Sequence, residues 1–193
     1  MSREISPETI ITGPRRVFQH LNEKPLRDDL IFYFAIVAAA SIFWTAASIL
    51  TEPHPVDGLG IEGLHQAGSV LSTIFVGVFL GFVGVFLGLA NGAVALLAVS
   101  LVEHFFLLFV DVHREFEKTM KSAVYALSPL ILFSWAVLLE IPFAGLLLLA
   151  WFCLSTYLGV WIFHEKSKDR AVFVALATGV VLAYYLHRAV GIV

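Results

Sequence analysis

The chain has 193 residues, of which 59% are hydrophobic and 14% are charged, and its formal net charge is -3. Soluble domains contain roughly 45–50% apolar and about 25% charged residues. A soluble protein of this length could not bury so much apolar surface, so lipid must cover it. The chain also lacks a dense basic patch outside its short loops, which argues against binding to nucleic acid.

Lys and Arg, 12 in all, occur in short clusters between long apolar stretches. None occurs from Asp28 to His113 or from Ser122 to Glu165, and Arg188 alone follows the last cluster. Short loops rich in Lys and Arg remain on the cytoplasmic side of a membrane. The clusters therefore predict an all-α, polytopic integral membrane protein of the cell membrane, and they mark its cytoplasmic face.

Residues 1–29 form the predicted cytoplasmic amino-terminal segment, and residues 30–193 form the predicted membrane domain. A short helix is expected from Pro14, because Pro favours the first turn, with Val17 and Phe18 on the face opposite Arg15. Such a helix suits the surface of an anionic leaflet, although a solvated lead-in would explain the same residues. The residues expected at the lipid interface, here and in the later cytoplasmic loops, are Arg15, Arg16, Phe18, Lys118, Lys121, Lys166, Lys168 and Arg170.

The first apolar run, Leu30 to Leu50, has the length of about 20 residues that crosses a bilayer. The loop after it, Thr51 to Ala67, contains Pro, Gly and acidic residues but no basic residue. That composition is expected of an irregular loop on the outer side of the membrane.

The next apolar stretch, Val70 to Val110, is too long for one ordinary crossing. A straight helix of that length would measure about 60 Å against a hydrocarbon core of about 30 Å, and Asn91-Gly92 is the expected breaking point. Two complete crossings would distribute the basic residues equally between the two sides, whereas one net crossing leaves only Arg188 outside. We therefore expect a crossing helix from Ala90 to Phe109 and a re-entrant, tilted or interfacial segment from Val70 to Leu89.

Further crossings complete the predicted topology. The first of them is expected to kink at Pro129, a tight turn at Glu140–Pro142 follows it, and HEKSKDR forms the last cytoplasmic loop. Their expected ranges are Ala123–Leu139, Phe143–Phe163 and Ala171–His187. The sequence thus predicts five net transmembrane helices plus a glycine-rich re-entrant or broken segment, with the amino terminus in the cytoplasm and the carboxyl terminus outside.

Glycines recur at helical spacing within the long apolar stretch, so that one face of a helix would carry them. Such a face allows two helix backbones to approach closely. Packing within the chain is the preferred interpretation, and an oligomer interface or a flexible gate is the alternative. The glycines are Gly77, Gly81, Gly84, Gly88 and Gly92.

The polar residues expected within or at the edge of the membrane are Asn91, Glu103, His104 and Glu140. Ionisable groups in such positions are functional hypotheses. Glu103 and His104 would serve a metal or proton site, but no ligand spacing such as H-E-x-x-H occurs, so a snorkelling or hydrogen-bonded pair near a helix end is preferred. Glu140 suits the positive end of a helix dipole. Catalytic residues, cofactors and metal ligands are not expected, since no motif of a well-known enzyme class is present.

The run LVEHFFLLFVDVHREFEKTMKSAVYALSPLILFSWAVLLEIP resembles the core of the Yip family, membrane proteins named for interacting with Ypt/Rab GTPases. The similar features are His104 in an apolar segment, Phe116 followed three residues later by Thr119, and the stretch Tyr125–Pro129. The chain departs from the pattern at Asp111–His113, where relatives often have Gly-Gly. It looks like a short, prokaryotic-type member, because a long amino-terminal cytoplasmic region is absent.

The resemblance implies five membrane helices with a cytoplasmic amino terminus, in agreement with the count of basic residues, and a role as a non-enzymatic membrane adaptor. The leading hypothesis is an integral membrane scaffold that contacts lipid or a membrane or cytoplasmic protein partner at its cytoplasmic face. The alternatives are a small channel or transporter that uses the broken glycine-rich segment, and an intramembrane metal-binding protein. A homo-oligomer is compatible with the sequence, and binding to a Rab protein does not follow from it.

Overall fold

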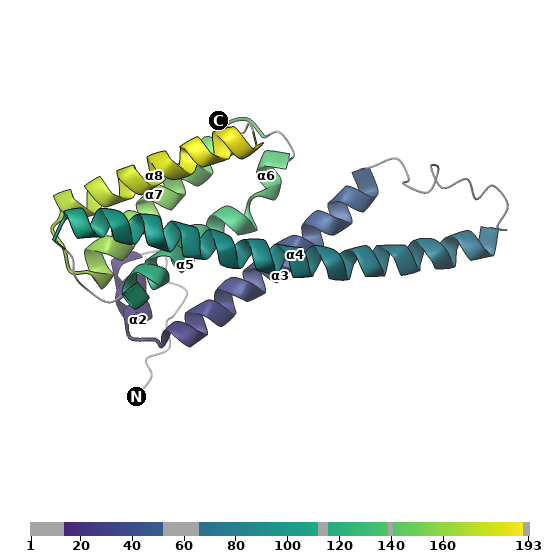
Figure 1. Ribbon diagram of the computed structural model, residues 1–193, viewed down its shortest axis with the longest axis horizontal. Helices are drawn as coiled ribbons and strands as arrows, with labels where there is room; N and C mark the ends of the chain where they lie inside the picture. The colour runs from purple at the N-terminus through teal and green to yellow at the C-terminus, as the bar shows by residue number, and fades with distance from the viewer. Residues whose placement is uncertain (1–13, 52–65, 112–115, 139–140, 191–193) are drawn as a thin grey trace.

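The computed structural model describes residues 14–51, 66–111, 116–138 and 141–190 (Figure 1). Every secondary-structure element in these ranges is a helix, and none of the described residues forms a β-strand. The expected all-α fold is therefore confirmed. The helices are α2 (Pro14–Asn22), α3 (Leu26–Thr51), α4 (Gln66–Phe109), α5 (Phe116–Leu132), α6 (Trp135–Leu138), α7 (Ala144–Phe163) and α8 (Lys168–Val190).

Helix α5 lies at the centre of the bundle and packs against α3, α4 and α7. Helix α7 also packs on α2 and α8, and α8 packs on α4. Figure 1 shows α4 as one long rod whose amino-terminal half extends well beyond the other helices, while α7 and α8 run side by side. Tyr33, Leu127 and Phe152 belong to an apolar cluster that joins α3, α4, α5 and α7, and Leu107 and Val160 belong to a second cluster beside α8.

Small side chains on α5 permit its central position. Ala123 and Ala126 are fully buried, and Ser122 lies directly against Gly159 of α7. A Cβ atom at Gly159 would meet the Ser122 Oγ at 2.2 Å and the Ser122 Cα at 3.2 Å. The two backbones therefore approach as closely as small residues allow, which is the usual way that helices associate within a membrane.

Helix α5 contains Pro129 and ends shortly after it. Proline has no N–H for the helix ladder and disturbs the turn before it, and α5 stops at Leu132. The chain continues through a turn at Phe133 and Ser134, where the Ser134 hydroxyl donates to the Ile131 carbonyl at 2.8 Å, before the short helix α6. The segment Phe116–Val137 as a whole is long and apolar enough to cross a membrane, and the kink at Pro129 stays a prediction.

Helix α4 corrects the predicted break at Asn91-Gly92, because it is continuous from Gln66 to Phe109. It therefore also contains no re-entrant reversal between Val70 and Leu89. A glycine in a helix costs only about 1 kcal/mol relative to alanine, and packing at this site offsets that cost. The Tyr33 hydroxyl donates to the Gly92 carbonyl at 2.9 Å, and a Cβ atom at Gly92 would lie 2.9 Å from the Val37 side chain.

The described residues contain 4 helical segments that are long and apolar enough to cross a membrane. They are Gly81–Phe109, Phe116–Val137, Ala144–Phe163 and Lys168–Arg188. Helix α3, which contains the predicted first crossing, is not among these segments, so the count of five crossings stays a prediction. The class of protein, a helical membrane protein, agrees with the composition.

Candidate functional site

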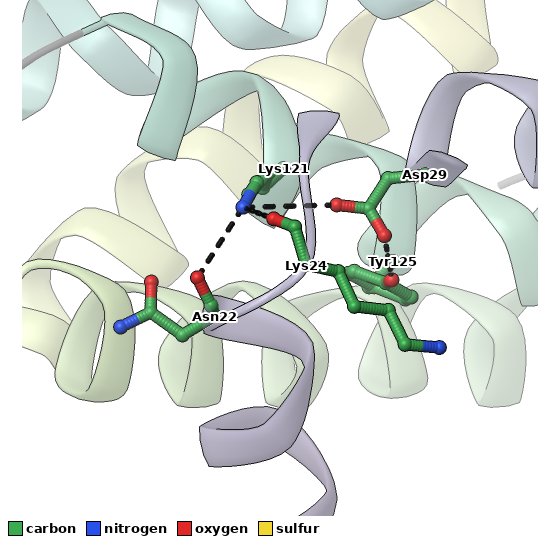
Figure 2. Close-up of polar contacts among 5 residues, drawn as sticks. All are labelled: Asn22, Lys24, Asp29, Lys121 and Tyr125. Atoms are coloured by element: carbon green, nitrogen blue, oxygen red, sulfur yellow. Dashed lines mark hydrogen bonds and ion pairs between the residues drawn. The ribbon is translucent and has the colours of Figure 1, made fainter. Parts of the chain in front are cut away.

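A buried lysine organises one end of the bundle. Lys121 of α5 is 5% exposed, and its ammonium donates to the carbonyls of Asn22 (3.4 Å) and Lys24. It also lies 4.0 Å from the Asp29 carboxylate (Figure 2). The two carbonyl contacts are hydrogen bonds, and the contact with the carboxylate is an ion pair. Lys121 therefore fixes the connection between α2 and α3 to α5, which corrects the prediction that it lies at the lipid interface.

Asp29 completes this network from the first turn of α3. Its side chain is 2% exposed, and the Tyr125 hydroxyl of α5 donates to its Oδ1 atom (Figure 2). Lys121 and Tyr125 are four residues apart, so they lie on one face of α5 and both reach Asp29. Burial raises the pKa of the Asp29 carboxyl above its ordinary value, while the Tyr125 hydroxyl and the Lys121 ammonium act against that rise.

Helix α2 packs on the bundle through an aromatic side chain. The ring of Phe18 lies 6.0 Å from the Tyr125 ring and 5.7 Å from the Phe163 ring, measured between centroids. The predicted helix from Pro14 is confirmed, but Phe18 contacts protein on the face that was expected to meet lipid. Together with Lys121, this contact holds α2 against α5 and α7.

The basic loops meet beside this anchor. Lys166 donates to the Asp111 carbonyl at 3.3 Å, and Arg170 donates to the Val110 carbonyl at 3.1 Å. The chain between α7 and α8 is therefore tied to the end of α4. Since Phe163 contacts Phe18, the connection between α2 and α3 lies at the same end. We call this end, with Asn22–Lys24, residues 110–111 and residues 164–170, the basic end.

Exposed side chains of both charges lie at the basic end, where Glu23, Glu165 and Asp169 accompany the cations. Lys168 and Arg170 are exposed, as are Lys24 and Arg27 near the start of α3, whereas Lys118 is half-buried. The Lys168 ammonium lies 5.3 Å from the centre of the Trp161 ring, which is a cation–π contact. This surface offers several cations to an anionic group.

The glycine face of α4 packs mainly within the chain. Cβ atoms at Gly84 and Gly88 would collide with Thr45 and Ser41 of α3, while Gly81 faces open space. The preferred interpretation of this stripe, packing within the chain, thus agrees with the structure at Gly84, Gly88 and Gly92. Asn91 is exposed and lines a groove of about 430 Å³ between α3, α4 and α5.

The intramembrane polar residues of α4 lie on different sides of the helix. Glu103 is fully buried, whereas His104 is half-buried and its Nδ1 atom lies 3.2 Å from the Thr119 hydroxyl of α5. The same hydroxyl lies 3.4 Å from Nε2 of His164, at the end of α7. Glu103 and His104 therefore do not form the expected pair, and each faces other helices.

Metal ligation finds no support in the part of the chain that the structure describes. These residues contain no group of three or more His, Cys, Asp or Glu side chains that could hold a metal ion. Some predicted positions lie outside the description, namely all of Glu140, the side chains of Arg15 and Arg16, and the surroundings of Gly77.

Asp29 and its contact with Tyr125 are the functional candidates that the sequence interpretation missed. The signal is the pair Asp28-Asp29 at the start of an apolar run, where an unpaired acidic residue would be costly to bury. Lys121 and Tyr125 carry the matching signal four residues apart. Neither signal identifies the partner without the packing of α3 on α5.

The fold and the basic end define a polytopic helical membrane protein with one organised polar face. Comparison with known families gives a match to the Yip1 domain over residues 9–188. The chain therefore belongs to the Yip1 domain family, as the resemblance of its central segment indicated. No curated protein and no solved structure matches the chain.

Proposed function

We propose that this Yip1 domain protein is a non-catalytic membrane scaffold that uses the basic end to hold anionic lipid headgroups at the cytoplasmic surface. The observation that carries the proposal is the anchoring of α2 beside the basic loops. Lys121 binds both Asn22 and Lys24, and Phe18 packs on α7. A helix held in this way has a fixed position at the end of the bundle that also carries the exposed Lys168 and Arg170.

The arrangement of the helices supports the predicted topology of five crossings. Contacts bring the start of α3, the end of α4, the start of α5, the end of α7 and the start of α8 to the basic end. A chain that alternates in this way crosses five times and finishes at the opposite end. Because basic loops are retained in the cytoplasm, the amino terminus lies inside and the carboxyl terminus outside.

Photocrosslinking in bilayers tests the lipid contact. The purified protein is placed in nanodiscs that contain a photoreactive phosphatidylserine, and adducts are mapped by mass spectrometry. The triple variant Lys166→Gln, Lys168→Gln, Arg170→Gln should lose most adducts at the basic end, since each cation near an anionic surface contributes about 1 kcal/mol. Arg188→Gln is the matched control, because it removes a cation near the other end of α8.

The same experiment with photoreactive phosphatidylcholine, whose headgroup has no net charge, shows whether the contact requires an anionic headgroup. Equal adduct yields from the two lipids, or equal losses in the triple variant and in Arg188→Gln, would refute the proposed headgroup contact. A partner protein recovered from native membranes, with no enrichment of anionic lipid, would instead assign the basic end to protein binding.

The channel hypothesis loses its structural basis, because it required a broken glycine-rich segment and α4 is continuous. Asn91 faces a groove at the side of the bundle, and Gly84 and Gly88 are covered by α3. The described residues likewise give no cluster for an intramembrane metal. The scaffold hypothesis depends on neither feature.

A further inference from the structure

Glu103 is a carboxylic acid enclosed by the membrane helices. Its exposed fraction is 0%, and neither carboxyl oxygen has a hydrogen-bond partner among the described residues. It lies less than two helical turns before Phe109, at the end of the span Gly81–Phe109. Buried polar groups almost always have partners, so an acid without one requires an explanation.

Hydroxyl groups from the neighbouring helices lie in the same interior. Ser100 of α4, Ser122 of α5 and Thr156 of α7 are buried, and their oxygens also lack hydrogen-bond partners within the described part of the chain. The Ser122 hydroxyl faces the Glu103 carboxyl without a bond of normal geometry. Ser122 also lies against Gly159, and Thr156 is one turn before Gly159 on the same face of α7. The acid therefore sits where α4, α5 and α7 meet.

The charged groups of the packed helices are directed elsewhere. Lys121 precedes Ser122 in the chain, but its ammonium binds Asn22, Lys24 and Asp29 (Figure 2). Arg170 of α8 donates to the carbonyl of Val110 at the basic end. An isolated carboxylate in an apolar interior has a large desolvation cost, whereas the neutral acid can donate its proton to a hydroxyl such as Ser122.

Two histidines lie on either side of the Thr119 hydroxyl, between this interior and the basic end. Thr119 Oγ1 lies 3.2 Å from His104 Nδ1 and 3.4 Å from His164 Nε2. A hydroxyl can accept from one ring nitrogen while it donates to the other, so the three side chains form a chain for proton transfer. Thr119 is one turn before Ser122 on α5, and His164 is followed by the exposed Glu165.

We propose that Glu103 is a reversible proton-binding site inside the helix bundle, and that protons reach its surroundings from the basic end past the Thr119 hydroxyl, which lies between His104 and His164. Uptake of one proton converts the Glu103 carboxylate to the neutral acid, and release of that proton restores the carboxylate. This inference is independent of the lipid contact proposed above.

Labelling with dicyclohexylcarbodiimide tests the site in protein reconstituted into lipid bilayers. The reagent enters apolar regions and reacts with the acid form, since the carboxyl proton moves to a carbodiimide nitrogen while the carboxyl oxygen bonds to the central carbon. We expect mass spectrometry to find the adduct on Glu103, with a yield that falls roughly tenfold per pH unit above the titration midpoint. Glu103→Gln should lose the adduct, and the exposed Glu117 serves as the internal control.

Absence of an adduct on Glu103 at every pH, in protein that remains folded, would overturn the proposal. Protection by Na⁺ without any dependence on pH would also overturn it, because the site would then hold a metal cation. An adduct yield on Glu117 equal to that on Glu103 would also overturn the proposal, because the enclosed carboxyl would then react no more than an exposed one.

Infrared spectroscopy tests the connection. The carbonyl band of the neutral acid, identified by its loss in Glu103→Gln, should shift when the bilayers are transferred to D₂O. Thr119→Val keeps the shape of the side chain but removes the hydroxyl, so we expect the shift to become several-fold slower. Ser128→Ala is the control, because its hydroxyl donates to the Val124 carbonyl within α5. Equal rates in wild type and Thr119→Val would overturn the connection through Thr119.

Discussion

Lys121 shows how one residue can determine the position of a whole segment. Its ammonium reaches the carbonyls of Asn22 and Lys24 as well as the Asp29 carboxylate. A buried ion pair gives little net stability compared with apolar residues, but the removal of one member leaves the other unpaired. The effect of losing Lys121 should therefore exceed the effect of losing the pair.

Lys121→Met should destabilise the protein by about 3 kcal/mol, at the lower end of the range for a broken buried pair. The lower end is expected because Asp29 can take up a proton, given that burial already raises its pKa. The double variant Lys121→Met, Asp29→Leu should recover part of the loss. Reversible unfolding in mixed detergent micelles measures these differences, and Lys118→Met is the control. A double variant less stable than Lys121→Met would contradict the argument.

The sequence alone does not predict which lysine side chains are exposed and which are buried. Lys118 and Lys121 occur in one cluster and both suit an interfacial loop, yet the structure leaves Lys118 half-buried and buries Lys121. The difference arises because residue 121 lies on the face of α5 that meets the connection between α2 and α3. That face is known only once the tertiary packing is known.

At the scale of elements, α4 shows why a glycine is a weak predictor of a break. Gly84, Gly88 and Gly92 lie under Thr45, Ser41 and Val37 of α3, so their lack of side chains is used for contact. The helical spacing of the glycines did predict this face. It did not predict continuity, because a straight helix over Val70–Val110 would measure about 60 Å, about twice the thickness of the hydrocarbon core.

Gly92→Ala and Gly81→Ala should change stability in opposite directions. At Gly92 the added methyl group would lie 2.9 Å from Val37, so we expect a loss of roughly 1–3 kcal/mol from overpacking. At Gly81 nothing lies within 4 Å, so alanine should give a gain of up to about 1 kcal/mol through its higher helix propensity. Unfolding in mixed micelles measures both. A stable Gly92→Ala variant would mean that α3 does not pack on α4 at this position.

Over the whole molecule, the distribution of basic residues predicts more than any single motif does. It predicts a helical membrane protein with its basic loops at one end, and the contacts of Lys166 and Arg170 with the end of α4 agree with that arrangement. The surroundings of Glu103 could not be predicted in the same way. The buried hydroxyl residues there come from α4, α5 and α7, and hydroxyl residues in apolar segments carry no signal of which face they occupy.

The proposed topology makes a prediction about accessibility from the two sides of the membrane. In a Cys153→Ala background, cysteine introduced at Lys118 should react with a membrane-impermeant maleimide only after the cytoplasmic side is opened. Cysteine at Arg188 should react in intact cells, because five crossings carry the chain to the outer side. A label at Lys118 in intact cells would reverse the orientation. Labelling of both positions from the cytoplasmic side alone would require an even number of crossings between them, and α5, α7 and α8 would then not all span.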